Sequence, residues 1–309
     1  MKCLIAIVGP TAIGKSSLGS LIAQDFAAEI VNADSRQIYR YMDIGTAKPS
    51  SEEQARVPHH LLDIILPDQS YSVALYQRSA AAVIADIHSR NRLPLLIGGS
   101  GQYIWSLIEG WQIPEVPPDT AFREMMVQKA SEKGTDYLFR ELERIDAAAA
   151  ARISPNNLRR IVRALELYRS TGRKPSELQQ KKGLDYPVFI IGLTTEREKL
   201  YQMIDTRVEK MIGKGLIEEV KGLLKMGYIP ELPSMSSLGY REIAAYLNNT
   251  MDLSIAVEKI KFETHRFARS QYAWFHLNDI RITWFQAGDD IKGKINYTIK
   301  TFLENVGKI

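Results

Sequence analysis

The chain has 309 residues, 45% of them hydrophobic and 25% charged, which is typical of a globular protein with one large domain plus an elaboration. No apolar run approaches the about 20 residues needed to span a bilayer, and a single cysteine, Cys3, excludes an internal disulfide and a Cys-based zinc site. Residues 1–8 lead directly into a functional motif and do not resemble a signal peptide, so we expect a cytoplasmic protein.

A phosphate-binding loop is the first motif. An apolar run, Leu4–Val8, predicts a buried strand, and apolar residues at helical spacing from Leu18 to Phe26 predict a helix. Between them lies a segment that fits the pattern G-x-x-x-x-G-K-[ST] at every fixed position: Gly9, Pro10, Thr11, Ala12, Ile13, Gly14, Lys15 and Ser16. Backbone N–H groups at the helix N-terminus hold phosphate oxygens in such loops, the lysine adds positive charge, and the serine hydroxyl binds an oxygen or Mg²⁺. We therefore predict a polyphosphate or pyrophosphate site over Gly9 to Ser17, with Ser16 as the candidate Mg²⁺ ligand.

A carboxylate is expected on the same edge of the sheet as this loop. Residues 30–33 read as a second strand, and Asp34 follows it directly. In a parallel α/β sheet, ligands bind beyond the carboxyl ends of the strands. Beside a pyrophosphate site Asp34 has three interpretations, as a Mg²⁺ ligand, a general base or a helix cap, and the residue pattern alone leaves them open.

The next stretch contains a helix and a third strand. His59 and His60 are adjacent and lack the i, i+4 spacing of a helical metal pair, which favours a structural or hydrogen-bonding role. Apolar positions from Ser72 to Arg90 predict an amphipathic helix, and Leu93–Ile97 predicts a strand that ends in Gly98-Gly99-Ser100-Gly101. This strand does not end in the acidic residue that an ATPase would use to hold its metal, which argues against nucleotide hydrolysis.

A helical, basic insertion is predicted from 114 to 182, between core segments 1–113 and 183–309. Prolines mark the exit from the core at 112–119, and helices are expected over 122–131, over 137–145 and from Pro155 to Gly172. For the last of these, Ser154-Pro155 predicts the N-cap and Gly172 the end. Residues 152–182 contain nine cations and two anions, a net charge of +7 against −3 for the rest of the chain. Arg159, Arg160 and Arg163 lie off the apolar stripe of their helix, and so much positive charge suits a phosphate backbone or a solvated helix face.

The core resumes near residue 188. Residues 188–193 predict a strand and 201–226 one or two helices, with Arg207 on an exposed side. Further helices are expected from 237–241 onward and over 255–275. The last segment alternates basic and aromatic side chains, which suits RNA contact, although aromatics at helical spacing also form core. Together these elements predict an α/β protein with a parallel sheet of the P-loop type and a helical insertion.

Seven motifs, in order along the chain, resemble the tRNA dimethylallyltransferase family. They are GPTAIGKS at 9–16, NADSRQIY at 32–39, MDIGTAKP at 42–49, PHHLLD at 58–63, GGSGQY at 98–103, LRRIVRALE at 158–166 and SLGYRE at 237–242. Ser16 and Ser100 stand where threonine is often found in this family. The zinc-finger extension of eukaryotic members is absent from the sequence, so a bacterial-type enzyme is expected.

The resemblance implies an activity and a set of roles. It implies transfer of a dimethylallyl group from dimethylallyl diphosphate to N6 of adenosine 37, beside the tRNA anticodon, by a Mg²⁺-dependent monomer. It makes Asp34 the general base and Ser16 and Arg207 contacts of the pyrophosphate. The implied tRNA contacts are Asp34, Ser35, Arg36, Gln37, Ser100, Arg123, Arg159, Arg160, Ile161, Val162, Arg163, Gly239, Tyr240 and Arg241. It also implies that the insertion grips the anticodon stem-loop.

Three other functions remain open from the residues alone. A P-loop nucleotide kinase would use the same loop for ATP. An isopentenyltransferase acting on free adenine nucleotides would need no basic insertion. A non-catalytic RNA-binding protein would not need Lys15, Ser16 and Asp34 to be intact.

Overall fold

The computed structural model describes residues 2–114, 116–178, 180–288 and 290–307. The chain forms two compact units: a core unit, Met1–Ile108 with Leu184–Ile309, and an insertion unit, Glu109–Gly183. These limits lie within a few residues of the predicted insertion, 114–182. Each unit has its own apolar core, and each is described separately below.

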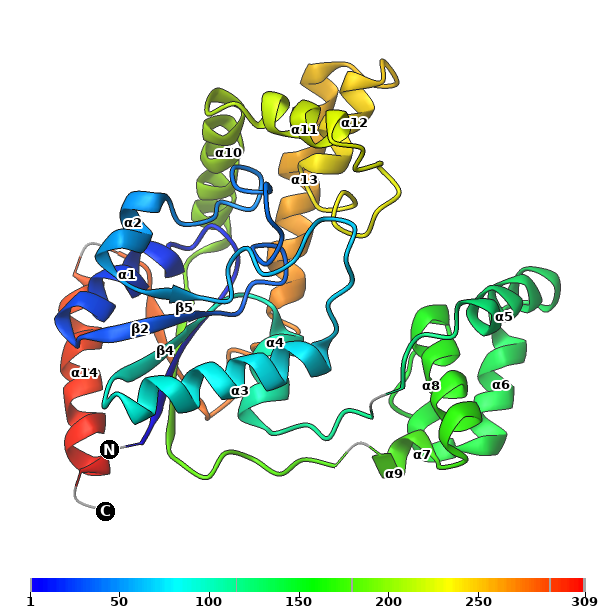
Figure 1. The fold of residues 1–309 in the computed structure, drawn as a ribbon, viewed down its shortest axis with the longest axis horizontal. Helices are drawn as coiled ribbons and strands as arrows, with labels where there is room; N and C mark the ends of the chain where they lie inside the picture. Colours follow the sequence, from blue (N-terminus) through cyan, green and yellow to red (C-terminus); the bar gives the residue numbers. More distant parts are fainter. Residues whose placement is uncertain (1, 115, 179, 289, 308–309) are drawn as a thin grey trace. The chain divides into compact units, whose positions relative to one another are not determined.

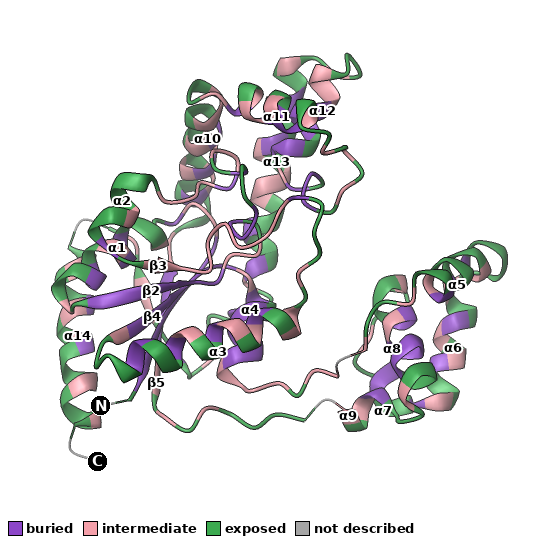
Figure 2. Ribbon diagram, viewed as in Figure 1, coloured by how far each residue is buried: buried purple, intermediate pink, exposed green. Residues whose placement is uncertain are grey.

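The core unit is built on a six-stranded parallel sheet of order β3-β2-β4-β1-β5-β6. Its strands are β1 (Leu4–Val8), β2 (Ala28–Asn32), β3 (His59–His60), β4 (Leu93–Ile97), β5 (Val188–Thr194) and β6 (Ile282–Gln286). β1, β2 and most of β4 and β5 are buried, as strands covered on both faces must be (Figure 2). The parallel α/β sheet predicted from the sequence is therefore confirmed.

Helices of the core unit lie on both faces of this sheet and beyond it. The helices of this unit are α1 (Lys15–Asp25), α2 (Ser51–Arg56), α3 (Val73–Ser89), α4 (Gly101–Ile108), α10 (Arg197–Gly213), α11 (Leu216–Lys225), α12 (Tyr240–Leu247), α13 (Leu253–Gln271) and α14 (Ile291–Val306). α11 and α12 pack against α10 and α13, respectively. Because crossovers between parallel strands are right-handed, α1, which leads outward to β2, and α3, which leads back to β4, lie on opposite faces. α14 packs beside α1, and α4 packs beside α3 (Figure 1). Across the described residues, no helix is both long enough and apolar enough to cross a membrane.

The last strand and helix lie outside every element predicted from the sequence. β6 reads Ile-Thr-Trp-Phe-Gln and pairs with β5 at the edge of the sheet. Its β-branched and aromatic residues are typical of a strand, but they follow an aromatic-rich segment that was predicted as helix to residue 275. That helix, α13, ends at Gln271.

The insertion unit is a helical bundle over its described residues. Its helices are α5 (Thr120–Lys133), α6 (Thr135–Ile145), α7 (Ala147–Ala150), α8 (Leu158–Thr171) and α9 (Pro175–Leu178). Gly172 ends α8 in the left-handed conformation, as predicted, with a φ of 66°. The predicted N-cap at Ser154 was wrong. Asn157 is the N-cap, because its side chain accepts a hydrogen bond from the backbone N–H of Arg160 at 3.2 Å.

Candidate active site

The phosphate loop joins β1 to α1 in the core unit, as its sequence predicts. Gly9 has a φ of 142°, and a side chain there would lie 2.5 Å from the carbonyl oxygen of Leu193 on β5. Gly14 has a φ of 94° and is the N-cap of α1, where it supplies no side-chain acceptor to the first turn. The first turn of α1 therefore leaves N–H groups that an anion can satisfy.

Lys15 lies over the loop from the first position of α1. Its ammonium donates to the carbonyl oxygens of Gly9 at 3.0 Å and Pro10 at 2.7 Å. Burial lowers the pKa of Lys15 to about 7, and Asp34 and Arg207 act on the same charge in opposite directions. Lys15, Asp34 and Arg207 are thus one electrostatic group, although they come from three separate elements.

Asp34 begins the turn that follows β2. The Asn32 side chain accepts a hydrogen bond from the N–H of Asp34 at 3.0 Å and donates to the carbonyl oxygen of Asp34 at 3.1 Å. One carboxylate oxygen of Asp34 accepts from the N–H of Arg36 at 2.9 Å. This turn holds the carboxylate in one orientation and leaves its second oxygen without a hydrogen bond among the described residues.

A cavity of about 350 Å³ lies beside this carboxylate. Its lining comes from the phosphate loop, the ends of β2 and β4, the 45–46 segment, the segment before α12, and helices α10 and α13. The lining residues already predicted for the site are Thr11, Asp34, Ser35, Arg36, Ser100, Arg207 and Gly239. The tertiary structure therefore brings together predicted residues as far apart in the sequence as Thr11 and Gly239.

Arg207 is half-buried on α10, rather than on the exposed helix side predicted from the sequence. Its guanidinium donates to the carbonyl oxygen of Thr46 at 3.5 Å and lines the cavity. Burial lowers the pKa of Arg207, and the nearby Asp34 opposes that shift. An arginine in this position remains charged and is suited to a phosphate group.

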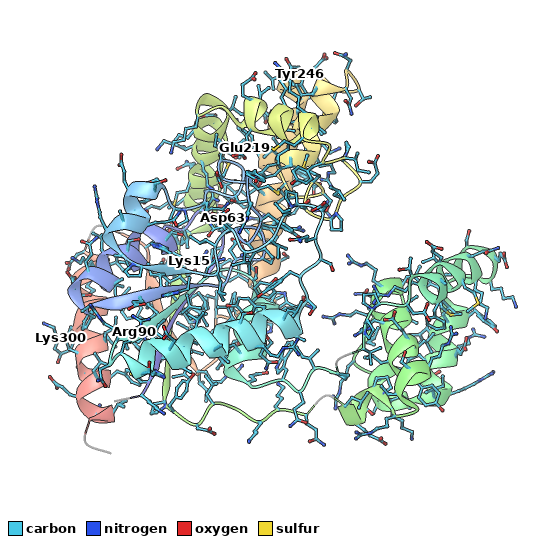
Figure 3. All side chains as sticks on the ribbon, viewed as in Figure 1. Lys15, Asp63, Arg90, Glu219, Tyr246 and Lys300 are labelled. Atoms are coloured by element: carbon cyan, nitrogen blue, oxygen red, sulfur yellow. The ribbon has the colours of Figure 1, made fainter. Side chains whose placement is uncertain are left out.

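The loop of residues 42–48 is fixed by hydrogen bonds to the carboxylate of Glu219 on α11. One carboxylate oxygen of Glu219 accepts from the N–H groups of Asp43 at 2.9 Å and Ile44 at 2.7 Å. The other accepts from the N–H of Gly45 at 3.1 Å and the hydroxyl of Tyr240 at 2.6 Å. Glu219 and Lys15 are both labelled in Figure 3. The loop carries Thr46, so Glu219 fixes the carbonyl group that receives Arg207.

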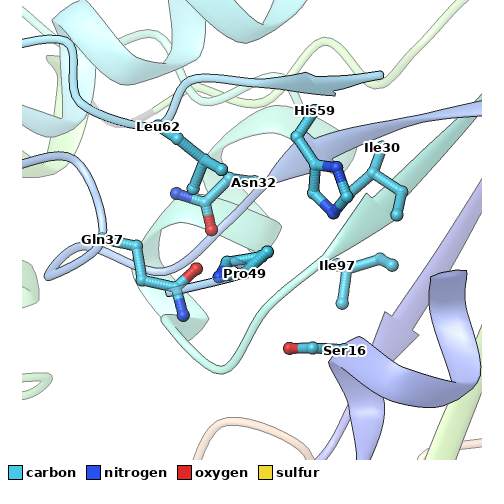
Figure 4. Close-up of a pocket in the computed structure, with 8 residues that line it drawn as sticks. All are labelled: Ser16, Ile30, Asn32, Gln37, Pro49, His59, Leu62 and Ile97. Atoms are coloured by element: carbon cyan, nitrogen blue, oxygen red, sulfur yellow. The ribbon is translucent and has the colours of Figure 1, made fainter. Parts of the chain in front are cut away.

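Ser16 lines a different and smaller space. This cavity of about 20 Å³ also contacts Asn32, Gln37, Pro49 and His59 (Figure 4). Among the described residues, no group of three or more His, Cys, Asp or Glu side chains could hold a metal. The Ser16 hydroxyl as a Mg²⁺ ligand stays a prediction.

Two histidines of the predicted motif set have hydrogen-bonding roles. A ring nitrogen of His59 lies 2.7 Å from the carbonyl oxygen of Val57. His60 lies 2.8 Å from the Glu29 carboxylate, which also pairs with Arg90. These contacts agree with the structural role expected for the pair.

Of the four insertion-unit arginines implied as tRNA contacts, two pair with a buried glutamate and two are exposed. Glu166, which is fully buried, accepts from Arg123 at 2.8 Å through two atoms and from Arg163 at 2.5 Å. Burial raises the pKa of Glu166, but these hydrogen bonds outweigh it and hold the value at about 2. Arg163 is therefore not free, contrary to expectation. Arg159 and Arg160 are exposed.

Four residues implied as tRNA contacts are buried. Ile161 and Val162 lie in the apolar core of the insertion unit, and their exposed fractions are 0% and 5%. Tyr240 is fully buried against Gly45, and Gln37 donates to the carbonyl oxygens of Thr46 and Ala47. Their side chains are thus engaged in contacts within the protein, and the implied tRNA contacts of these four residues stay predictions. The burial of Ile161 and Val162 follows from helical periodicity, because they belong to the apolar stripe of α8.

Two residues of the site have no counterpart in the predictions. Gln271 lines the cavity from the last position of α13, and Glu219 orders the loop of residues 42–48. Trp274, which lines the cavity from the turn after α13, belongs to the basic and aromatic segment predicted to suit RNA contact. Gln271 stands in a segment dominated by basic and aromatic residues, and nothing in the local pattern distinguishes it. Glu219 resembles any other helix carboxylate until its four hydrogen-bond partners are known.

Family models match most of the chain. The model described as IPP transferase matches residues 37–278, and the model described as isopentenyl transferase matches residues 2–64. The tRNA dimethylallyltransferase of Roseiflexus castenholzii is 52% identical over 272 residues, which cover 88% of this chain and 89% of that protein. The tRNA dimethylallyltransferase of Dehalococcoides mccartyi is 47% identical over 305 residues, which cover 99% and 94%.

Solved structures match as well. The tRNA isopentenylpyrophosphate transferase of Bacillus halodurans superposes with a TM-score of 0.74 at 39% identity, covering 100% of this chain and 99% of that one. A eukaryotic dimethylallyltransferase solved acting on tRNA superposes with a TM-score of 0.80 at 26% identity, covering 99% and 80%. Both likenesses extend over the core unit and the insertion unit.

Proposed function

Because this chain belongs to the IPP transferase family, we propose that it transfers a dimethylallyl group from dimethylallyl diphosphate to N6 of adenosine 37 in tRNA. The observation that carries the proposal is the cavity of about 350 Å³, which contacts the phosphate loop, Asp34 and Arg207 at once. A phosphate-binding loop supplies the site for the leaving group, and the Asp34 carboxylate, which lines the same cavity, supplies a base.

The leaving group is stabilised by positive charge around the loop. Transfer breaks the allylic C–O bond, so negative charge develops on the departing diphosphate. Lys15, Arg207 and the N–H groups at the start of α1 meet that charge. Mg²⁺, when bound, neutralises part of the same charge as a Lewis acid, and Ser16 is the protein residue that would hold it.

The acceptor amine is activated from the other side. The lone pair of adenine N6 is delocalised into the ring, so removal of its proton as the C–N bond forms lowers the barrier. Asp34 has a carboxylate oxygen available for this proton, because its other oxygen is already bonded to the N–H of Arg36. The adenosine must leave the stack of the anticodon loop to reach this position. Ser35, Arg36, Ser100, Gly239 and Arg241 are the proposed contacts at the core unit.

The insertion unit supplies affinity for the anticodon stem. Arg159 and Arg160 are the proposed phosphate contacts, since they are exposed. Arg123 and Arg163 keep part of their guanidinium surface exposed while they pair with Glu166, with exposed fractions of 40% and 34%. We propose that both guanidinium groups also contact RNA phosphates, and that the pairing with Glu166 fixes their orientation.

The test is transfer to an anticodon stem-loop with adenosines at positions 36 to 38, in the presence of dimethylallyl diphosphate and Mg²⁺. Mass spectrometry should detect one added dimethylallyl group on adenosine 37. Prenylation of free AMP without reaction of the RNA would favour an isopentenyltransferase acting on nucleotides. ATP-dependent phosphate transfer would favour a kinase.

The role of Asp34 is tested with Asp34→Asn. The amide oxygen can still accept from the N–H of Arg36, so the turn should keep its shape while the base is lost. Turnover should fall by about 10²- to 10⁴-fold, the range typical of general-base catalysis, with stem-loop affinity nearly unchanged. Turnover equal to wild type would show that Asp34 is not the general base.

A further inference from the structure

The side chain of Gln271 joins the phosphate loop to the glycine turn after β4. Its amide oxygen accepts from the N–H of Thr11 at 2.7 Å, and its amide nitrogen donates to the carbonyl oxygen of Gly99 at 2.9 Å. Gln271 is only 4% exposed and stands at the last position of α13. One buried side chain thus connects three segments that are far apart in the sequence.

These two bonds require a glutamine. The Thr11 N–H needs an acceptor and the Gly99 carbonyl needs a donor, and a primary amide offers both. A glutamate could not donate to Gly99, and a lysine could not accept from Thr11. The orientation of the amide is therefore fixed by its two backbone partners.

The contact is close as well as polar. A side chain on Gly99 would lie 2.2 Å from the amide nitrogen of Gln271 and 3.5 Å from the carbonyl oxygen of Gly9. The phosphate loop and the 98–101 turn therefore approach each other at Gly99, with Gln271 between them. The positions of the two segments are therefore coupled through the hydrogen bonds and close contacts of Gln271.

The 98–101 turn in turn holds the segment that carries Asp34. The Ser100 hydroxyl oxygen accepts from the N–H of Ser35 at 2.9 Å, and the hydroxyl donates to the Ser35 hydroxyl at 3.1 Å. The N–H of Ser100 also donates to the carbonyl oxygen of Ala33 at 3.2 Å. A continuous chain of hydrogen bonds therefore runs from Thr11 through Gln271 and the glycine turn to the residues on either side of Asp34.

We propose that Gln271 is a positioning residue that sets the place of the diphosphate loop relative to the Asp34 turn. This inference rests on the proposed prenyl transfer, for which the reacting carbon must meet the acceptor nitrogen between the two. Each substrate still binds without Gln271, because the loop and the turn remain. What is lost is their alignment, and a displacement of about 1 Å can lower a rate about 10²-fold.

The test compares Gln271→Met with Gln77→Met. Methionine keeps the volume and removes both hydrogen bonds. Gln77 on α3 is a matched control, because its amide donates to the carbonyl oxygen of Ser106 at 2.6 Å and does not line the cavity. In single-turnover prenyl transfer, corrected for the fraction of enzyme that binds pyrophosphate, Gln271→Met should be about 100-fold slower. Its affinities for pyrophosphate and stem-loop should change far less, and Gln77→Met should react at the wild-type rate.

A second variant separates the two bonds. Gln271→Glu keeps an oxygen for the Thr11 N–H and loses the donor for Gly99. Its rate of prenyl transfer should therefore fall as it does in Gln271→Met. The inference is overturned if Gln271→Met transfers at the wild-type rate, or if its rate falls only in proportion to pyrophosphate affinity. A wild-type rate for Gln271→Glu would overturn it too, because the link to Gly99 would then be dispensable. If wild-type enzyme transfers no prenyl group, the proposed function fails instead.

Discussion

At the scale of single residues, Lys15 is the group most altered by folding at the phosphate loop. Its ordinary pKa of 10.5 falls to about 7, chiefly because the site is buried. The unfolded chain therefore binds more protons than the folded chain between these two values, so this residue makes the stability of the free protein rise with pH across that window. A bound diphosphate has the opposite effect, because its negative charge favours the protonated amine.

Pyrophosphate binding should therefore take up a proton at Lys15 when the pH is near or above 7. Affinity should fall as the pH rises past that value. Calorimetry in buffers of different ionisation enthalpy measures this uptake. Lys15→Arg and Lys15→Met should both lose the part of it due to Lys15, while the proton release from pyrophosphate itself remains. Only the arginine variant, which stays charged, should keep affinity at high pH. Equal uptake in all three proteins would contradict the shifted pKa.

At the scale of elements, the loop of residues 42–48 depends on two helices that follow it by almost two hundred residues. Glu219 on α11 receives three backbone N–H groups of the loop, and Tyr240 on α12 packs its ring against Gly45. Gly45 must lack a side chain, since one would lie 2.4 Å from that ring. The loop is thus shaped by helices rather than by its own sequence, and its carbonyl at Thr46 receives Arg207.

Glu219→Gln should weaken both the fold and the pyrophosphate site. The new NH₂ group would point at hydrogen-bond donors that the carboxylate oxygen of Glu219 now accepts from. Each buried donor that loses its acceptor in this way costs about 1–3 kcal/mol. A misplaced Thr46 would then release Arg207 and reduce pyrophosphate affinity. Thermal unfolding and calorimetry measure the two effects.

Glu218→Gln is the matched control for this change. Glu218 is the neighbouring carboxylate on α11, and it is exposed and pairs with Lys221 at 3.6 Å. Its replacement should alter neither stability nor affinity. If Glu219→Gln and Glu218→Gln behave alike, Glu219 has no role in ordering the loop.

At the scale of the whole molecule, chemistry and RNA affinity are assigned to different units. The candidate active site lies within the core unit, while the cationic stretch lies within the insertion unit. Arg163 stabilises Glu166 and keeps an exposed surface, so we propose that it both supports the fold of the insertion unit and contacts RNA. Its replacement would also disturb the fold of the unit, so Arg159 and Arg160 give the cleaner test.

Arg159→Ala with Arg160→Ala should weaken stem-loop binding and lower its dependence on salt. Each lost phosphate contact should reduce the slope of log affinity against log salt by about 0.7–0.9. Turnover at saturating RNA should stay near wild type. Lys294→Ala with Lys300→Ala on α14 makes the same change in net charge on exposed residues of the core unit, and should leave the slope unchanged. Equal slopes for both double variants would mean that Arg159 and Arg160 do not contact RNA and only form a solvated face of α8.

The sequence by itself determined the phosphate loop, the parallel sheet and the position of Asp34 after β2. These follow from local rules, because glycine and lysine spacing, apolar runs and strand ends act over a few residues. The same rules predict the end of α8 at Gly172. They predict its start less well, because Asn157 and Ser154 are both good N-caps and only the fold selects between them.

The tertiary structure decided what each side chain does. Periodicity gives the face of a helix but not its neighbour, so it could not predict that Arg163 pairs with Glu166 or that Arg207 is half-buried. Ile161 and Val162 lie in a matching motif, but helical periodicity already places them on the apolar stripe, and the structure shows which residues they pack against. Gln271 and Glu219 act on backbone groups more than 170 residues away. Such contacts between distant segments exist only once the chain has folded, so no local pattern could predict them.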